Sequence, residues 1–270
     1  MYPRRLLLIS ALVLHSGAAF AHEFWIEPNA YNVKSGDAVK GDLRNGQEFD
    51  GISLAYFDNR FTRFDVVNGD DVVPVEGRLG DNPALSAVAG ADGLMIVVHE
   101  TMPSTITYKT WEKFATFAKH KDFAKAQEDH TTAGWPTSDF KERYTRHAKA
   151  LIGVGSGEGA DRALGLETEF VAMTNPYADG FDGQMRVSLL YQGSARMDAQ
   201  VEVFERAPDD TVAITMARTD VHGEAVIAVK PGHTYLFDAV VLRPAPDSGE
   251  TENSPLWETL WAALTFAVPD

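Results

Sequence analysis

Short apolar segments separated by turn residues constrain the fold of this chain more than any other feature. After residue 165, turn residues such as Pro231-Gly232 separate segments of strand-like composition. These segments are Leu166–Ala172, Met185–Tyr191, Val201–Glu205, Val212–Ala217, Ala225–Val229, Tyr235–Leu242 and Leu264–Val268. Their number and spacing are typical of an immunoglobulin-like sandwich. We therefore predict a β-sandwich over residues 165–270, with a short helical turn that carries Trp257 and Trp261 before its last strand.

The first part of the chain has a similar pattern. Turn residues such as Asn45-Gly46 and Asn68-Gly69 separate short apolar runs. The runs are Ala38–Leu43, Ile52–Phe57, Phe61–Val67, Val72–Val75, Leu94–His99 and Thr105–Tyr108. The alternating segment Glu23–Pro28 comes before them and ends at a proline, which is typical of a sheet edge. We predict a second sandwich over residues 22–107.

A different periodicity occupies the middle of the chain. Aromatic residues recur every three positions from Tyr108 to Phe117, and a second set of apolar residues follows at helical spacing. That second set is Phe140, Tyr144, Ala148 and Leu151. We predict a helical hairpin over residues 108–152 and, from the alternating glycines that follow, a flexible linker over residues 153–164. The predicted fold is mainly β: two immunoglobulin-like or prealbumin-like sandwiches with a helical insertion between them.

Residues 1–21 have the features of a secretory signal peptide. Arg4 and Arg5 precede the apolar run Leu6–Leu14, and Ala19-Phe20-Ala21 fits a small-x-small cleavage site. No later apolar run is long enough to cross a bilayer as a helix. The sequence therefore predicts an exported periplasmic protein without a membrane span, whose mature form begins at His22.

Composition excludes several classes of function. The chain has 24 Lys and Arg against 39 Asp and Glu, a formal charge of −15 that disfavours nucleic acid as a partner. Because it has 0 Cys, it has no disulfide, no thiolate metal site and no cysteine nucleophile. The G-x-S-x-G motif of serine hydrolases is also absent, so we do not expect an enzyme.

Cleavage before His22 would create a metal-chelating residue. Its free α-amine and its imidazole can bind one ion in a six-membered ring, and copper(II) and nickel(II) favour such nitrogen-rich sites. Glu23 could add an oxygen ligand, and His99 stands at the end of a predicted strand, where ligands are often found. We therefore predict a divalent transition metal held by His22, Glu23 and His99. We interpret His120 and His130 as solvated surface histidines.

The predicted mature start, His-Glu-Phe-Trp-Ile-Glu-Pro over residues 22–28, resembles the opening of a periplasmic family of unknown function. Members are often labelled a nickel or cobalt transport periplasmic component (NikM-like). Residues 143–151, 165–169 and 257–266 are also similar to that family. The resemblance implies export, a β-sandwich architecture and an association with nickel, cobalt or another divalent metal. In the last third, the order Thr219-Asp220-x-x-Gly223, short strand, Pro231-Gly232 resembles prealbumin-like modules such as the carboxypeptidase regulatory domain.

The function predicted from the sequence is metal binding in the periplasm, as an accessory of nickel, cobalt or copper uptake or handling, with an envelope transport component as a possible partner. Two alternatives stay open. One is an envelope protein-interaction module without metal, which would dock through aromatic patches such as Trp257 and Trp261. The other is a copper-dependent oxidative enzyme built on an N-terminal His chelate, which needs a second imidazole beside the terminus.

Overall fold

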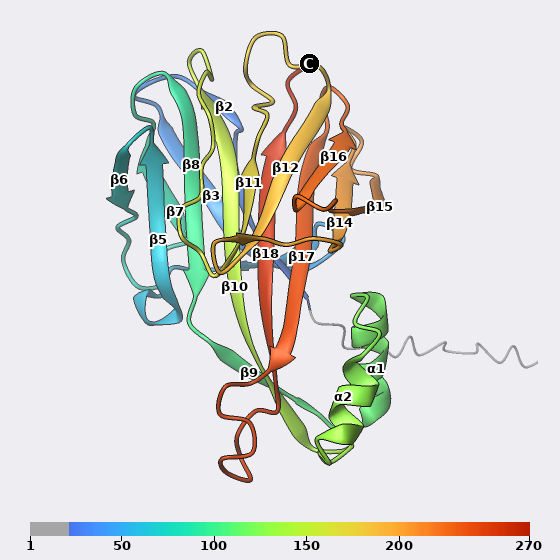
Figure 1. Cartoon of the computed structure of the whole chain (residues 1–270). Helices are drawn as coiled ribbons and strands as arrows, with labels where there is room; N and C mark the ends of the chain where they lie inside the picture. Colours follow the sequence, from blue (N-terminus) through green and yellow to red (C-terminus); the bar gives the residue numbers. More distant parts are fainter. Residues whose placement is uncertain (1–21) are drawn as a thin grey trace, which may run out of the picture.

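The computed structural model describes residues 22–270, and three β-sheets dominate it (Figure 1). A ten-stranded sheet forms the centre, in the order β15-β14-β17-β18-β10-β8-β5-β6, and β2 and β9 also pair with β10. Its strands are β2 (Asn32–Val33), β5 (Phe61–Asn68), β6 (Asp71–Pro74), β8 (Gly93–Thr101), β9 (Ser104–Tyr108), β10 (Phe140–Val154), β14 (Gln200–Arg206), β15 (Val212–Arg218), β17 (Thr234–Pro244) and β18 (Trp257–Ala267). The predicted mainly β architecture is therefore confirmed.

Two smaller sheets complete the fold. The first has the order β1-β3-β4, with β7 also paired to β3, and the second has the order β11-β12-β13, with β16 paired to β12. The strands of the first are β1 (Glu23–Pro28), β3 (Ala38–Gln47), β4 (Asp50–Leu54) and β7 (Leu85–Val88). Those of the second are β11 (Thr168–Ala172), β12 (Gln184–Tyr191), β13 (Ser194–Ala195) and β16 (Glu224–Ala228). As predicted, β1 lies at the edge of its sheet.

The two small sheets bury opposite faces of the central sheet. In β8, Leu94, Ile96 and Val98 pack into one hydrophobic cluster with the β11-β12 sheet, whereas Met95 and Val97 pack into another cluster with the β1-β3 sheet. Successive residues of a strand point to opposite faces, so a strand covered on both faces is apolar without alternation. This explains why Leu94–Val98 is an uninterrupted apolar run.

Within residues 22–270, two short α-helices, α1 (Trp111–His120) and α2 (Ala126–Thr132), cover one end of the central sheet, and η1 (Asp58–Arg60) is a single 3-10 turn. Phe114 and Phe117 of α1 stack on Trp257 and Trp261 of β18, with ring centroids 5.5 and 6.0 Å apart. This packing explains the aromatic spacing of the first predicted helix. No helix in the described part of the chain is long and apolar enough to cross a membrane.

Two predicted elements are wrong, because helical spacing was mistaken for a helix. Residues 140–152 form strand β10 rather than the second helix of a hairpin, and Trp257 and Trp261 belong to β18 rather than to a helical turn. Phe140, Tyr144 and Ala148 are four residues apart, and a spacing of four also places side chains on one face of a strand. β10 is held by β8 and β9 on one side and by a parallel pairing with β18 on the other.

The predicted domain boundaries do not separate the sheets. The central sheet takes β5, β6, β8 and β9 from residues 22–107, β10 from the middle segment, and β14, β15, β17 and β18 from residues 165–270. The predicted linker at 153–164 begins inside β10. Further along it, the Glu158 carbonyl accepts a hydrogen bond from the Leu94 amide, and the Asp161 carboxylate pairs with Lys149.

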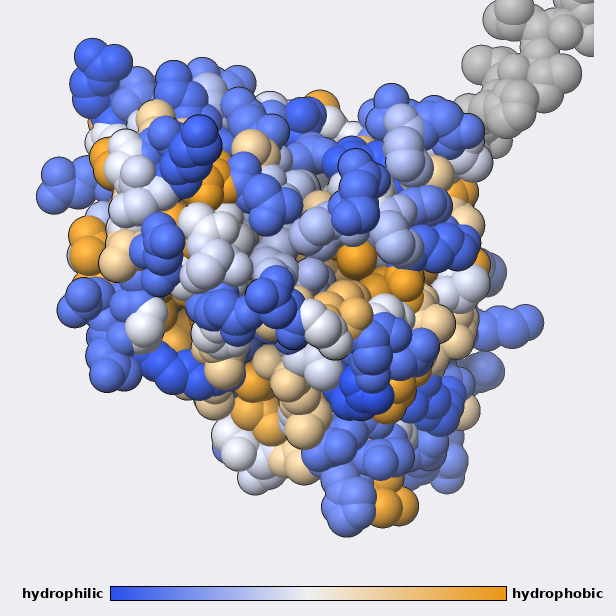
Figure 2. Space-filling model, turned by 90° about the horizontal axis from the view of Figure 1, so that it is seen from above, coloured by the Kyte–Doolittle hydropathy of each residue, from blue (hydrophilic) through white to orange (hydrophobic). Residues whose placement is uncertain are grey.

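Viewed from above, hydrophilic residues cover most of the surface, and hydrophobic residues form small separate patches (Figure 2). The face seen in this view therefore has no broad apolar patch.

Candidate functional site

Helix α1 ends by placing two basic side chains beside the start of β1. His120 is its last residue, and Lys121 follows as the C-cap with its amide bonded to the Phe117 carbonyl. Cations are favoured at a helix C-terminus because the last carbonyls carry partial negative charge. The side chain of Lys121 nevertheless turns inward, and only 6% of this residue is exposed.

Three buried carboxylates surround Lys121; we call this group the carboxylate cluster. The Lys121 ammonium lies 2.7 Å from Glu202 Oε2, 2.9 Å from Asp238 Oδ2 and 3.8 Å from Glu23 Oε1. Glu202 and Asp238 face each other directly across the antiparallel pair β14–β17. Like charges in that position repel, so the ammonium between them is what makes the arrangement stable.

Burial sets the protonation of the cluster. Removal from water and the neighbouring charge of Asp238 raise the pKa of Glu23 to about 8, so this carboxyl holds a proton at neutral pH. Burial also raises the pKa of Glu202. Burial opposes the charge of Lys121, but Asp238 and Glu202 outweigh that effect and raise the pKa of the ammonium. Glu23 Oε2 has no hydrogen-bond partner within the described residues, so the cluster has one unsatisfied oxygen.

Arg146 connects the cluster to the first described residue. Its guanidinium lies over the rings of Tyr144 and Trp261, each 5.1 Å from the centroid, and the Lys121 ammonium lies 4.7 Å from the Trp261 centroid. Arg146 Nη1 also donates a hydrogen bond to the carbonyl of His22. This bond, together with the pairing of Glu23 with Gly46 of β3, fixes the backbone at the start of β1.

A small pocket opens above the cluster. Its volume is about 230 Å³, and its polar lining comes from Glu23, Gln47, Glu48, His120, Lys121 and Glu202. His120 Nε2 lies 2.9 Å from Glu202 Oε1, and 48% of the His120 side chain is exposed. His22 is exposed at the start of the adjoining strand. The pocket therefore combines a buried acidic floor with an imidazole at its rim.

The structure brings together only part of the predicted metal site. Glu23 lies in the cluster, and His22 is its exposed chain neighbour. His99 lies elsewhere: it is 3% exposed, packs against Phe24 and Phe64 at ring distances of 5.1 and 5.0 Å, and has its pKa lowered to about 3 by burial. Glu23 and Phe24 are successive residues of an extended strand, so their side chains point to opposite sides. Among residues 22–270, no group of three or more His, Asp and Glu side chains is arranged to hold a metal ion.

His120 is exposed, as the sequence predicts for a surface histidine, but the sequence does not predict its pairing with Glu202 at the rim of the pocket. A His-Lys pair at the end of a predicted helix was the available signal. The partners of that pair, Glu202 and Asp238, come from strands far along the chain, which spacing alone does not reveal. His130, by contrast, is not solvated: it is 1% exposed and accepts a hydrogen bond from Trp257 Nε1.

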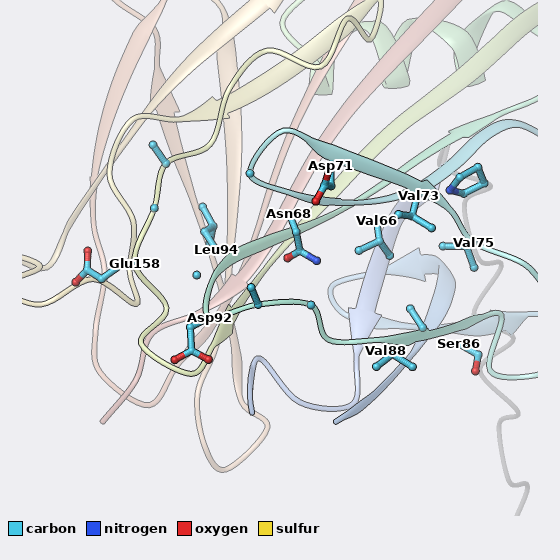
Figure 3. A pocket seen from close by; sticks show the side chains of 18 of the residues that line it. Val66, Asn68, Asp71, Val73, Val75, Ser86, Val88, Asp92, Leu94 and Glu158 are labelled. Carbon is cyan, nitrogen blue, oxygen red and sulfur yellow. The ribbon is translucent and has the colours of Figure 1, made fainter. Parts of the chain in front are cut away.

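A larger hollow lies elsewhere. It has a volume of about 840 Å³ and is lined by β5, β6, β7, the start of β8 and residues 158–160. Figure 3 shows Val66, Val73 and Val75 together on one side, with Asp92 and Glu158 well away from them. Its charged side chains do not converge on one point, and no histidine lines it. For that reason the smaller pocket above the carboxylate cluster is the stronger candidate site.

Comparisons with known proteins give a family but no activity. Among solved structures, the chain is similar to the D0-D1 domain of intimin, with 12% sequence identity, coverage of 91% of this chain and 97% of that chain, and a TM-score of 0.22. No curated protein matches. A family model described as a domain of unknown function, DUF4198, matches residues 19–243, which is most of the sequence. The chain therefore belongs to the DUF4198 family.

Proposed function

We propose that the exported, cleaved chain binds one divalent transition-metal ion, nickel, cobalt or copper, at its N-terminal residue. In this proposal the α-amine and imidazole of His22 chelate the ion, and the imidazole of His120 is the third nitrogen ligand. The protein would act in the periplasm as an accessory of metal uptake or handling, beside an envelope transport component, as in the nickel and cobalt transport proteins that its N-terminal motif resembles.

One observation carries this proposal: the backbone of His22 is fixed beside a pocket that already holds an imidazole. Arg146 binds the His22 carbonyl, β1 pairs with β3 from Glu23 onward, and His120 and Glu23 line the same pocket. Chelation by one residue whose backbone is already ordered loses little conformational entropy. A fixed terminus therefore favours a tighter metal complex than a mobile one.

The chemistry of the donor set favours the rim over the carboxylate cluster as the position of the proposed ion. Lys121 already supplies a cation between Glu202 and Asp238, and Glu23 holds a proton at neutral pH. Neutral imidazole and amine nitrogens suit nickel and copper. The acidic floor beneath them lowers the electrostatic cost of a bound dication.

Calorimetric titration with nickel(II) and copper(II) tests the proposal on the mature chain and on four variants. His22→Ala and a chain extended by one Met before His22 should each lose at least about tenfold in affinity, and His120→Gln a similar factor. His222→Gln is the matched control, because His222 is an exposed histidine in a distant turn. If His222→Gln weakens binding as much as His22→Ala, or if no variant weakens it, the proposal is wrong.

His120 also favours one second candidate, a copper-dependent oxidative enzyme, because such a site needs a second imidazole beside the terminus. It predicts that the copper-loaded protein consumes ascorbate and O₂ over many turnovers and that His120→Gln stops this reaction. A copper complex without turnover would favour metal handling. The interaction-module alternative loses its proposed docking residues, since Trp257 and Trp261 are each 2% exposed beneath α1.

A further inference from the structure

A second pocket lies on the other side of β1; we call it the aromatic pocket. Its volume is about 350 Å³, and Phe24, Phe61 and Tyr144 contribute its aromatic wall. At its mouth, Phe57 and Met102 are each 43% exposed. The apolar surface therefore continues from the interior of the pocket to the solvent.

The charge of this lining is opposite to that of the chain. The protein has 39 Asp and Glu against 24 Lys and Arg, yet the pocket is lined by two arginines, Arg60 and Arg146, and by no carboxylate. Within residues 22–270 the Arg60 side chain has no ion-pair or hydrogen-bond partner. An arginine without a carboxylate partner beside an apolar hollow is suited to hold an anionic group.

His99 adds a neutral polar group to the same wall. It is 3% exposed, and its Nδ1 has no hydrogen-bond partner among the described residues. A buried polar atom without a hydrogen-bond partner destabilises a folded protein. Such atoms are more often found where a ligand or a water molecule supplies the missing hydrogen bond. Because burial lowers the pKa of His99 to about 3, the ring is uncharged at neutral pH and can donate or accept one hydrogen bond.

We propose that the aromatic pocket binds a small organic anion: a carboxylate attached to an aromatic or branched aliphatic body. The apolar body lies against Phe24 and Phe61, and the carboxylate lies toward Arg60 at the mouth, where it keeps part of its hydration. This site is separate from the proposed metal site. The two touch only at Arg146, which lines the aromatic pocket and binds the His22 carbonyl.

Calorimetry at neutral pH with two probes of the same ring system tests the charge preference. Naphthoate supplies the anion, and naphthalenemethanol is its uncharged counterpart. We expect naphthoate to bind at least about tenfold more tightly, because a charge-assisted hydrogen bond to arginine is stronger than a neutral one. Arg60→Gln should remove most of that difference and leave the binding of naphthalenemethanol unchanged.

Two further variants make the result specific. Arg186→Gln is the matched control, because it also removes one positive charge. Arg186 is a partly exposed residue of β12 that is paired with Asp182 and does not line the aromatic pocket. Ala55→Trp places a bulky ring in the pocket and should abolish the binding of both probes. Equal affinities for the two probes, no saturable binding of naphthoate, or equal losses in Arg60→Gln and Arg186→Gln would each overturn the proposal. His22→Ala should bind naphthoate like the wild type, so failure of the metal proposal is distinguishable from failure of this one.

Discussion

Lys121 and Lys149 are both buried between carboxylates, but their surroundings differ. Lys149 is 1% exposed and binds Asp161 and Glu169, at 2.7 and 3.1 Å, as well as two backbone carbonyls. Glu169 in turn accepts the amides of residues 164–166. The Lys121 cluster has an unsatisfied oxygen on Glu23 and a pocket above it. A buried charged cluster whose polar atoms all have hydrogen-bond partners stabilises the fold. A cluster that has a polar atom without a partner and lies beside a pocket can still bind a ligand.

The comparison predicts its largest effect at Lys149. Lys149→Met leaves Asp161 and Glu169 buried without their counter-charge, which costs about 3–5 kcal/mol of unfolding free energy. Urea unfolding followed by circular dichroism measures the loss, and Lys113→Met on the exposed face of α1 is the control. A loss below that of Lys121→Met would contradict the assignment of Lys149 as the structural lysine.

Lys121→Met should cost less, about 2–3 kcal/mol, because water and protons can reach the carboxylates through the pocket. The repulsion between Glu202 and Asp238 is then the main source of the loss. Adding Glu202→Gln to Lys121→Met should therefore recover part of the stability, as a double-mutant cycle in the same urea assay would show. Strictly additive losses would mean that the two side chains do not interact.

Glu23 gives the cluster a pH dependence. Its pKa is about 8 in the folded chain against 4.5 for a free carboxyl, so between these values the folded state binds more protons than the unfolded state. Stability from this group is therefore complete at low pH and falls as the pH rises from about 4.5 to 8. At about 1.4 kcal/mol per pKa unit, Glu23→Gln should flatten that decline by up to roughly 5 kcal/mol. Urea midpoints at several pH values test this, and parallel curves for both proteins would refute it.

The smallest effect on stability is expected at the rim. His120→Gln should change the free energy of unfolding by less than about 0.5 kcal/mol, because the side chain is half-exposed and its pairing with Glu202 is screened by water. Thermal unfolding without metal measures this. A large loss would make His120 part of the structural network and would weaken its proposed role as a ligand.

The short strands could be predicted because turn residues separate them along the sequence. The seven predicted segments after residue 165 each contain or overlap an observed strand from β11 to β18. The central sheet was not predictable in the same way. Tyr144 and Ala148 fit a helix and a strand equally well, and what decides between them is the pairing of β10 with β8 and β18, at distant positions in the chain.

The same limit applies to the candidate site. Local sequence was enough to propose His22 and the neighbouring Glu23, because chelation by a chain terminus requires only one residue. It wrongly grouped His99 with them, because the direction of a side chain from a strand depends on the partner sheet. Lys121, Glu202 and Asp238 meet through tertiary packing, so no spacing in the sequence reveals their cluster.

The position of β18 has a consequence for how the chain acquires its fold. Trp257–Ala267 lies between β17 and β10, so it joins β15-β14-β17 to β10-β8-β5-β6. A nascent chain that stops before Trp257 has two half-sheets, each with an open edge where β18 belongs. Its parallel partner in β10, such as Glu142 for Trp257, was synthesised more than a hundred residues earlier. Pairing across such a separation is slow because a long loop must close first. The central sheet can therefore be completed only late in synthesis, and until then both half-sheets keep an unpaired edge strand.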